Sequence, residues 1–203
     1  MDFSKKASVE TINTVIQRLA LRNINAVLAK NKSDALSKII DMIPEGSSLL
    51  EASSTTLKEI GFDDYIKSNP KKWDILKDKI QAESNDAKRA DLRRQLTFSD
   101  YTIGSVHAIT ESGEIVFASA SGSQIPGYVY TAKNVIWVVG SQKIVNNIEE
   151  GIQRIKEYVF PKEDARMKSI GAPGSNIAKI ILFYKEMIPG RINLIFVDDI
   201  LGF

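Results

Sequence analysis

Two uninterrupted apolar runs constrain the fold of this chain more than any other feature. Residues 135–139 read Val-Ile-Trp-Val-Val, and residues 194–197 read Leu-Ile-Phe-Val. Such runs are typical of strands that are covered on both faces. Near the start of the chain, apolar residues recur at helical spacing, as at Val9, Ile12 and Leu19. Strands that alternate with amphipathic helices predict a layered α/β domain.

The same patterns predict the order of the elements. Helices are expected over residues 4–21, 34–42 (capped by Ser33), 85–96, 144–158 and 177–184, with a short one ending at Ile60. Strands are expected over residues 24–28, 48–51, 106–111, 114–118, 134–139 and 192–197, with another around Thr102. Ser112-Gly113 separates two of these strands and is a hairpin signal. A hairpin requires an antiparallel pair, so we expect a mixed sheet.

Length and cysteine content limit the organisation and the chemistry. The chain has 203 residues, which suits one domain over 1–203, with an N-terminal helical segment over 1–22 and a charged helical insertion over 61–98. It contains no cysteine, which excludes a thiol nucleophile, a Cys-ligated zinc and an iron–sulfur cluster held by this chain. The single histidine, His107, excludes a His-rich metal site. We therefore expect the chain to hold no metal and no redox cofactor of its own.

The charge balance and the hydropathy indicate where the protein works. The net charge is +2, and basic residues are interspersed with acidic ones, which argues against a nucleic-acid partner. No apolar run reaches the roughly 18 residues of a membrane helix, and the first residues contain no apolar signal segment. We therefore expect a cytoplasmic protein without a membrane span. The charged section 61–98 is compatible with a solvated face or with an arm that packs on a partner, including a second copy of the chain in a homodimer.

Three hydroxyl residues, Ser53, Ser54 and Thr55, lie between an expected strand and an expected helix. In open α/β sheets, ligands bind beyond the carboxyl ends of the strands, where helix N-termini favour anions. These hydroxyls can therefore hold a phosphate or a carboxylate. A plain helix cap needs only one of them, and no glycine-rich phosphate loop accompanies them, so both interpretations stay open.

Glu111 ends an expected strand beside the Ser112-Gly113 turn. A carboxylate at such a corner can serve as a general base or nucleophile when burial tunes it; an exposed turn carboxylate is the alternative. His107 would share a strand face with Glu111, but roughly 13 Å away at about 3.3 Å per residue. A catalytic dyad is therefore not expected, and His107 is interpreted as structural.

A second loop of small residues, 171–176, reads Gly-Ala-Pro-Gly-Ser-Asn. Its glycines would let the backbone approach a ligand closely. Ser175 or Asn176 could instead cap the helix expected after it.

Several segments together resemble the lactate-utilization (LUD) domain family, the family of lactate utilization protein C. They are Tyr101-Thr102-Ile103-Gly104-Ser105, Ala108-Ile109-Thr110-Glu111-Ser112-Gly113-Glu114, Val138-Val139-Gly140 and the loop 171–177. The order of elements over residues 48–197 is also similar to that family. The chain departs from the family pattern at four positions. Ser112 and Glu114 replace threonines, Thr110 replaces an alanine, and Asn176 stands where an aspartate is usual.

The resemblance implies a three-layer α/β/α domain with a mixed, mostly parallel sheet, like that of the ribose-5-phosphate isomerase and CoA-transferase group. It also implies an accessory or ligand-binding role in L-lactate oxidation, with a small carboxylate or phosphate anion as ligand and iron–sulfur clusters in partner subunits. A stand-alone enzyme for a phosphorylated or CoA-linked metabolite, with Glu111 as base or nucleophile, is the alternative, and a purely structural protein is a third. Ligand contacts are expected from Ser53, Ser54, Thr55, Gly104, Ser112, Gly113, Gly171, Pro173, Ser175 and Asn176.

Overall fold

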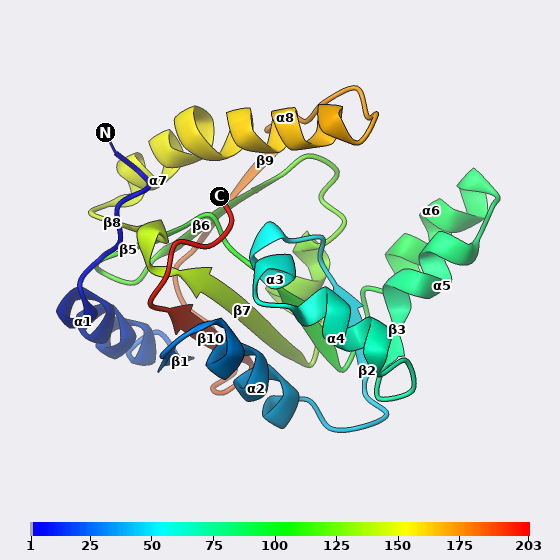
Figure 1. Cartoon of the computed structure of the whole chain (residues 1–203), viewed down its shortest axis with the longest axis horizontal. Coiled ribbons are helices and arrows are strands. Elements are labelled where there is room, and N and C mark those ends of the chain that lie inside the picture. The colour runs from blue at the N-terminus through cyan, green and yellow to red at the C-terminus, as the bar shows by residue number, and fades with distance from the viewer. Residues whose placement is uncertain (1) are drawn as a thin grey trace.

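The computed structural model describes residues 2–203, and its centre is a sheet of six parallel strands (Figure 1). Their order is β1 (Ile24–Ala29), β10 (Ile192–Val197), β7 (Asn134–Gly140), β4 (Tyr101–Gly104), β2 (Ser48–Glu51) and β3 (Asp74–Ile75). The two apolar runs lie in β7 and β10, which pair with each other and with β4 and β1 on their outer sides. Both faces of these central strands are buried, as their sequences predicted.

Three helices cover one face of this sheet. They are α2 (Lys32–Met42), α3 (Thr55–Glu59) and α4 (Phe62–Ser68). Ile39, Leu57 and Phe62 from these helices form one apolar core with alternate residues of the central strands, including Ile136 and Ile195. Side chains at every second position of a strand point to the same face of the sheet. The remaining apolar residues of these strands therefore point to the opposite face.

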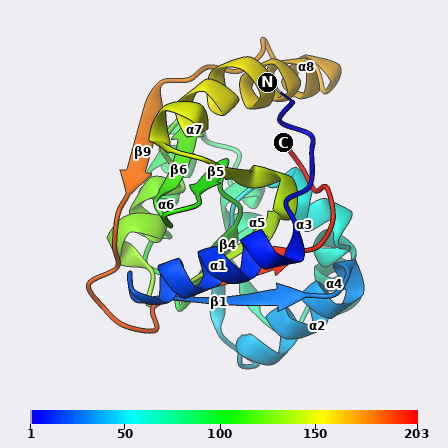
Figure 2. The same cartoon turned by 90° about the vertical axis from the view of Figure 1, so that its left-hand side faces the viewer.

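The opposite face is covered by α1 (Val9–Ala20) and by a second sheet (Figure 2). That sheet has the order β8 (Ile144–Val145), β5 (Ala108–Thr110), β6 (Ile115–Ser119) and β9 (Lys179–Phe183). Ile12, Phe117 and Trp137 belong to the core between these layers. Two further helices, α7 (Ile148–Arg154) and α8 (Phe160–Ser169), run along the outer side of the small sheet. The layered α/β class with an N-terminal helix is confirmed.

One detail of the sheet prediction needs correction. The parallel strands and the hairpin belong to two sheets rather than to one mixed sheet. The β5–β6 hairpin turns at Ser112-Gly113, as expected, but it pairs with β9 and β8 instead of joining the large sheet. A hairpin signal specifies the local antiparallel pair and not the sheet that receives it.

The segment 177–184 was predicted as a helix and is instead strand β9. Ile181 and Phe183 face the core, whereas Ile180 and Leu182 are largely exposed, which is the two-residue period of a half-buried strand. A short apolar run carries little helical or strand preference by itself. Antiparallel pairing of the whole segment with β6 decides the outcome.

The helix expected over 144–158 was misplaced at both ends. Residues 144–145 form strand β8, and Asn147 caps α7. The helical path then continues beyond its expected end at residue 158, through a π-helical turn at Ile155–Val159 into α8 and past Pro161. Proline lacks a backbone donor, and it is tolerated here because it stands in the first turn of α8.

The remaining helix starts were predicted less accurately than the helices themselves. The first helix begins at Val9 with Ser8 as its cap, and not at residue 4. Asn31, and not Ser33, caps α2, because its side-chain oxygen accepts the backbone N–H of Asp34 at 2.9 Å. Nearby polar residues compete for a cap, and backbone geometry at the helix entry selects between them.

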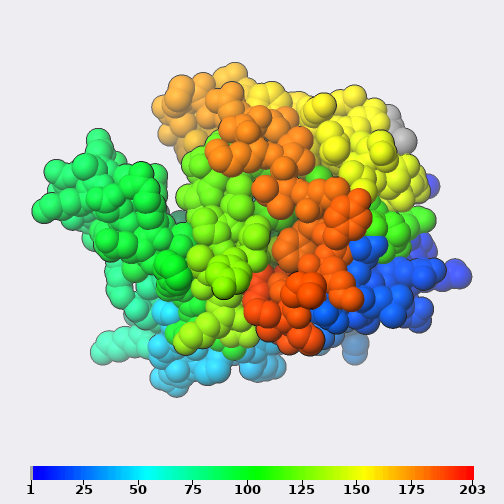
Figure 3. All heavy atoms as spheres, turned by 180° about the vertical axis from the view of Figure 1, so that it is seen from behind, coloured from blue at the N-terminus to red at the C-terminus, as the bar shows by residue number. Residues whose placement is uncertain are grey.

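The charged section 61–98 folds into α4, β3, α5 (Leu76–Ala82) and α6 (Asp86–Gln95). Trp73 and Leu76 anchor it in the apolar cores, but α6 has no buried residue. Seen from behind, the α5–α6 hairpin stands apart from the rest of the molecule (Figure 3). None of the helices within residues 2–203 combines the length and the apolar character needed to cross a membrane.

Candidate functional site

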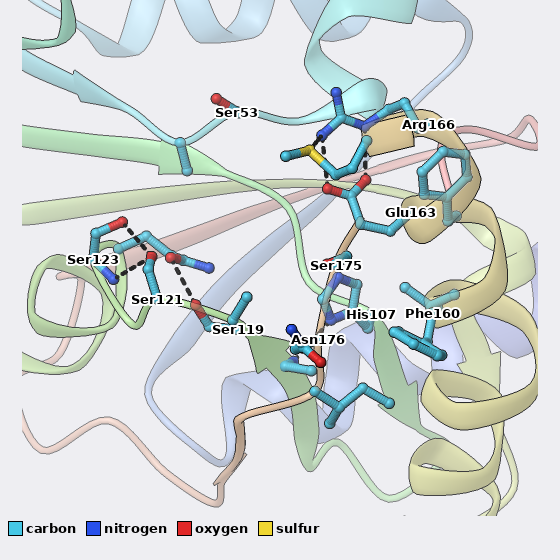
Figure 4. Close-up of a pocket in the computed structure, with 18 of the residues that line it drawn as sticks. Ser53, His107, Ser119, Ser121, Ser123, Phe160, Glu163, Arg166, Ser175 and Asn176 are labelled. Carbon is cyan, nitrogen blue, oxygen red and sulfur yellow. Dashed lines mark hydrogen bonds and ion pairs between the residues drawn. The ribbon is translucent and has the colours of Figure 1, made fainter. Parts of the chain in front are cut away.

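A cavity of about 500 Å³ lies beyond the carboxyl end of β2. Most of its walls come from five segments that are distant in sequence: residues 50–53, 118–124 and 175–177, the α5–α6 hairpin, and the helical stretch from the π turn into α8 (Figure 4). His107 and Phe203 also line it. Crevices at the carboxyl ends of parallel strands are where open α/β sheets bind ligands. π-helical turns are also frequent at functional sites, and both end residues of this one, Ile155 and Val159, line the cavity.

A serine-rich loop after β6 forms one wall. Ser119, Ser121 and Ser123 line the cavity together with Gln124. The loop is held in shape by its own hydrogen bonds: Ser119 Oγ accepts the N–H of Gly122 at 2.9 Å and donates to Gln124 Oε1 at 3.0 Å. Ser121 and Ser123 join their hydroxyls at 3.1 Å (Figure 4). The loop therefore presents several hydroxyl groups from a fixed backbone.

His107 presents a single hydrogen-bond donor to the cavity. Its Nδ1 accepts the backbone N–H of Ala118 at 2.8 Å, so Nδ1 carries no proton. Burial, aided by the positive charges of Lys143 and Arg154, lowers the pKa of His107 from 6.5 to about 3. The ring is therefore neutral at physiological pH and carries its proton on Nε2. Within residues 2–203 Nε2 has no hydrogen-bond partner, and the half-buried ring lines the cavity.

Five charged side chains complete the walls. Glu51 pairs with Lys77 at 3.0 Å, and burial raises the pKa of Glu51 although Lys77 partly offsets the effect. Glu163 receives both a 2.7 Å bond from Arg166 Nε and a 2.7 Å bond from Arg166 Nη2 on the same helix. Arg93 from α6 is the fifth. Because each carboxylate already faces a cation, these walls carry a positive excess that suits an anionic ligand.

Two of the predicted site segments meet at this cavity. Ser53 is exposed on one side of it, and Ser175 and Asn176 lie on another (Figure 4). Ser54 does not join them: it caps α3 through the N–H of Leu57 at 3.4 Å, so the capping interpretation holds for that residue. Thr55 is the first residue of α3 and is not a lining residue either.

The loop 171–176 is held in place by Asp164 of α8, and not by capping a helix that follows it. Asp164 Oδ1 accepts the N–H of Ser175 at 2.9 Å. Strand β9 follows this loop, so the expected helix-capping role of Ser175 and Asn176 was wrong. Gly171 adopts a φ of 83° in the turn after α8 and, like Pro173, does not line the cavity.

Glu111 does not line this cavity. It is exposed at the β5–β6 turn and borders a separate shallow hollow that Arg18, Arg22 and Lys185 also line. Ser112 lies in the same hollow and donates to Glu114 Oε2 at 2.5 Å. A catalytic role for Glu111 stays a prediction, but the loops of Ser53, Glu111 and Ser175 do not converge on one cleft.

Two glycines of the family-like segments have packing roles. Gly104 ends β4 directly beneath Tyr128: a Cβ built there would overlap the Tyr128 hydroxyl and come within 3.1 Å of Ala52 Cβ. Gly113 has a φ of 95° in the hairpin turn and packs against Arg18 and Arg22. Neither lines the cavity, so a ligand contact at either glycine stays a prediction.

Sequence reasoning missed most of the cavity wall. The residues concerned are Lys77, Arg93, Ser119, Ser121, Ser123, Gln124, Glu163 and Arg166. The alternating serines of 119–123 were a usable signal, since they follow an expected strand directly. The charged residues gave none, because they come from helices whose placement depends on the tertiary fold. Within residues 2–203, no group of three or more acidic or histidine side chains is arranged to hold a metal ion.

Comparison with known proteins identifies the family. Residues 12–197 match the LUD domain. The chain belongs to the LUD domain family. This family is associated with lactate utilization. No curated protein matches the chain.

A solved structure supports the fold of this LUD domain. The crystal structure of a DUF162 family protein from Deinococcus radiodurans is similar, with a TM-score of 0.58 and 12% sequence identity. The similarity covers 95% of this chain and 99% of that one. At this identity it supports the architecture and carries no information on the ligand.

Proposed function

We propose that this LUD-domain protein binds a small organic anion in the cavity and serves as an accessory or ligand-binding component of an L-lactate or related organic-acid oxidation system. The observation that carries the proposal is the cavity itself, which brings Ser53, the 119–124 loop, His107 and Asn176 together beyond the carboxyl end of β2. Membership of a family associated with lactate utilization supplies the metabolic context. Partner subunits would hold the iron–sulfur clusters, because this chain has no cysteine to bind them.

The volume of the cavity bears on the ligand. Pockets of about 300 to 1,000 Å³ hold drug-sized molecules, and this one is about 500 Å³. Lactate fills only part of this volume. It has about six non-hydrogen atoms, so it is only several times larger than a water molecule, which takes up about 30 Å³ in the liquid. The cavity can therefore hold lactate with space to spare, or a larger organic acid. A phosphorylated or CoA-linked metabolite, the ligand class of the alternative enzyme, is also compatible with this volume.

The proposal is tested with a cavity-blocking variant. Ser53 is exposed on the cavity wall, so Ser53→Trp fills the space with little effect on packing. Ser37→Trp is the matched control, because Ser37 is exposed on α2 and is not a cavity residue. We expect the deletion strain to lose growth on L-lactate, with rescue by the wild type and by Ser37→Trp but not by Ser53→Trp. Unchanged growth after deletion would refute the metabolic role.

Partner capture provides the second measurement. A tagged wild-type protein is recovered from its native host, and the bound proteins are identified by mass spectrometry. Recovery of a cysteine-rich iron–sulfur protein is the expected result. Recovery of the chain alone would favour the stand-alone enzyme and direct attention to turnover of phosphorylated or CoA-linked metabolites.

A further inference from the structure

Lys143 is a buried cation without an acidic partner. It follows β7 in a short 3₁₀ turn, and its side chain is almost fully buried. Nζ contacts two hydroxyl oxygens, Thr56 Oγ1 at 3.1 Å and Ser105 Oγ at 3.0 Å. Ser105 Oγ in turn donates to Val138 O at 2.7 Å, so it accepts from Lys143. No carboxylate within residues 2–203 forms an ion pair with this ammonium group.

Arg154 is a second cation of the same kind. Its side chain is fully buried at the end of α7, over the ring of Tyr158 at 5.0 Å from the ring centroid. Nη1 donates to His107 O at 2.6 Å, whereas Nε and Nη2 find no hydrogen-bond partner among residues 2–203. Burial lowers the pKa of Arg154 to about 10. Burying unpaired charges and unsatisfied donors destabilises a folded protein, so a compensating role is expected for them.

His107 connects these two cations to the cavity. Arg154 donates to the His107 backbone carbonyl, and Lys143 contacts Ser105, two residues before His107. The charges of both cations lower the pKa of the imidazole. The ring lines the cavity, as do Ser175 and Phe160, and its Nε2–H is free to donate to a ligand (Figure 4). A charged group bound against Nε2 would therefore feel the field of two poorly hydrated cations, which acts strongly in a low-dielectric interior.

We propose that the anionic group of the ligand, a carboxylate or a phosphate, binds against His107 Nε2, and that the buried side chains of Lys143 and Arg154 balance its charge from behind. The inference rests on the proposed ligand-binding function of the cavity and adds its charge selectivity. Lys143 and Arg154 are positioning residues that act through the His107 loop. The neutral imidazole is the direct contact, because its fixed tautomer donates a hydrogen bond without adding charge.

Proton uptake follows from this arrangement. The groups that act on Lys143 are Arg154 from α7, which with burial keeps the pKa of Lys143 well below 10.5, and Glu59 from α3, which opposes the shift. His107, which follows the Lys143 contact Ser105 by two residues, is neutral and adds no charge. A bound anion favours the charged lysine and raises its pKa. The pKa of Lys143 is therefore lower in the free protein than in the complex with the anion. Between these two values binding takes up a proton, and the affinity for the anion falls as the pH rises through that range.

The first experiment uses the wild-type protein and matched probes. L-Lactate, pyruvate, inorganic phosphate and the neutral amide lactamide are each added, and the shift of the melting temperature is measured. A ligand that binds only the folded state raises the melting temperature by mass action. We expect a rise with at least one anion and none with lactamide. No rise with any anion, or an equal rise with lactamide, would overturn the proposal. The separate arms for lactate and phosphate distinguish a carboxylate from a phosphate ligand.

Variants then test the two cations. Lys143→Met and Arg154→Met remove a buried charge with little change of volume, and Lys185→Met and Arg18→Met are matched exposed controls in the other hollow. We expect Lys143→Met to melt no lower than wild type without ligand and to bind the anion at least about tenfold more weakly, because charge pairs in low dielectric contribute strongly to binding. His107→Gln, which keeps a donor, should retain more affinity than His107→Leu.

Two further results would decide against the proposal. Unchanged anion affinity in both buried variants would assign the cations a structural role only. The wild-type pH profile is independent of variant folding: affinity that does not fall with rising pH would remove Lys143 from the site. Unchanged growth of the deletion strain on L-lactate, with anion binding intact in the purified protein, would refute the proposed pathway and leave this inference standing. The two failures are therefore distinguishable.

Discussion

Arg191 and Glu186 form a buried ion pair that anchors a segment of irregular backbone. Arg191 Nε donates to Glu186 Oε2 at 2.8 Å, Nη1 to Ala132 O at 3.1 Å and Nη2 to Tyr128 O at 2.6 Å. The last two bonds hold the π-helical turn at Gly127–Thr131 against the start of β10. Unlike Lys143, this cation has every donor group engaged and a carboxylate beside it. Arg191 is thus a buried cation whose charge and donors are all matched within the fold.

Replacing Arg191 should therefore be costly. Arg191→Met leaves Glu186 buried without a partner, and we expect a loss of about 3 to 5 kcal/mol in the free energy of unfolding. Urea denaturation monitored by tryptophan fluorescence measures it. The double variant Arg191→Met/Glu186→Met should recover part of the loss, because no unpaired charge remains. A single variant as stable as wild type would contradict the assigned role of the pair.

Glu111 provides a test of the site assignment. Because it borders the shallow hollow and not the cavity, Glu111→Gln should leave the anion-induced shift in melting temperature unchanged. Ser53→Trp, measured in parallel by the same method, should abolish that shift. Loss of binding in Glu111→Gln would move the ligand site to the hairpin turn and restore the base or nucleophile hypothesis.

Some of the site residues could be predicted from sequence and others could not. Ser53 follows a strand that the sequence predicts, and strand-end loops gather at one edge of a parallel sheet. Ser175 is indicated by its small-residue loop, but the strand that follows it was predicted as a helix. Glu163 and Arg166 reach the cavity only because the helix passes Pro161 without ending. From the sequence, His107 is interpreted as structural because the expected strand places it too far from Glu111 for a catalytic dyad. In the structure His107 lies outside β5, and its accessible Nε2 is evident only once the partner of Nδ1 is known.

At the level of elements, one carboxylate joins the starts of three strands. Asp100 precedes β4; its side chain accepts bonds from Ser48 N at 3.0 Å and Ser48 Oγ at 2.7 Å in β2, and from Lys133 Nζ at 2.8 Å just before β7. Lys133 and Ser48 hold the pKa of Asp100 well below its usual 3.8. The ionised form is thus favoured by folding, and the side chain aligns the amino ends of these strands.

This arrangement predicts a pH-dependent difference between wild type and Asp100→Asn. A carboxyl whose pKa is lower in the folded state stabilises the protein above its unfolded pKa and loses that contribution as the pH falls through the folded value. Wild type should therefore be the more stable at pH 7, and the difference should shrink below pH 3.8. Denaturant titrations at both ends of this range measure it. A difference that grows on acidification would contradict the assignment.

The errors at the level of elements share a physical cause. β9 and the helix after β8 were misassigned because short apolar runs, and a proline close to a helix start, leave the local preference undecided. In both cases tertiary packing determines the secondary structure. Pairing with β6 makes the first segment a strand, and packing on the outer face of the small sheet keeps the second segment helical. The long runs in β7 and β10 were predicted correctly because no other arrangement buries them.

At the scale of the whole molecule, the cavity is bounded on one side by the rigid sheet core and on the other by the weakly anchored α5–α6 hairpin. α6 contributes no buried residue, and its contact with the body is a small apolar cluster around Leu76 and Ile80. Yet Arg93 of α6 and Lys77 of α5 line the cavity, as does Arg166 of α8. A bound anion would thus be attracted by cations of the hairpin and of α8.

Hydrogen exchange tests this coupling between the hairpin and the site. Segments with few buried contacts open locally at low cost, so the amides of α6 should exchange fastest among the helices of the free protein and those of α1, with Ile12, Val15 and Leu19 in the core, among the slowest. Addition of the anion that raises the melting temperature should slow exchange in α6 and in residues 119–124, and leave α1 and α2 unchanged. Mass spectrometry of peptic fragments resolves these segments.

The variant Arg93→Met separates the hairpin from the rest of the site. It should remove the ligand-induced protection of α6 against exchange, while the protection of residues 119–124 persists, because the serine loop contacts the ligand independently of the hairpin. Equal protection of α6 in Arg93→Met and wild type would show that the hairpin responds to a general stiffening of the fold and not to the ligand.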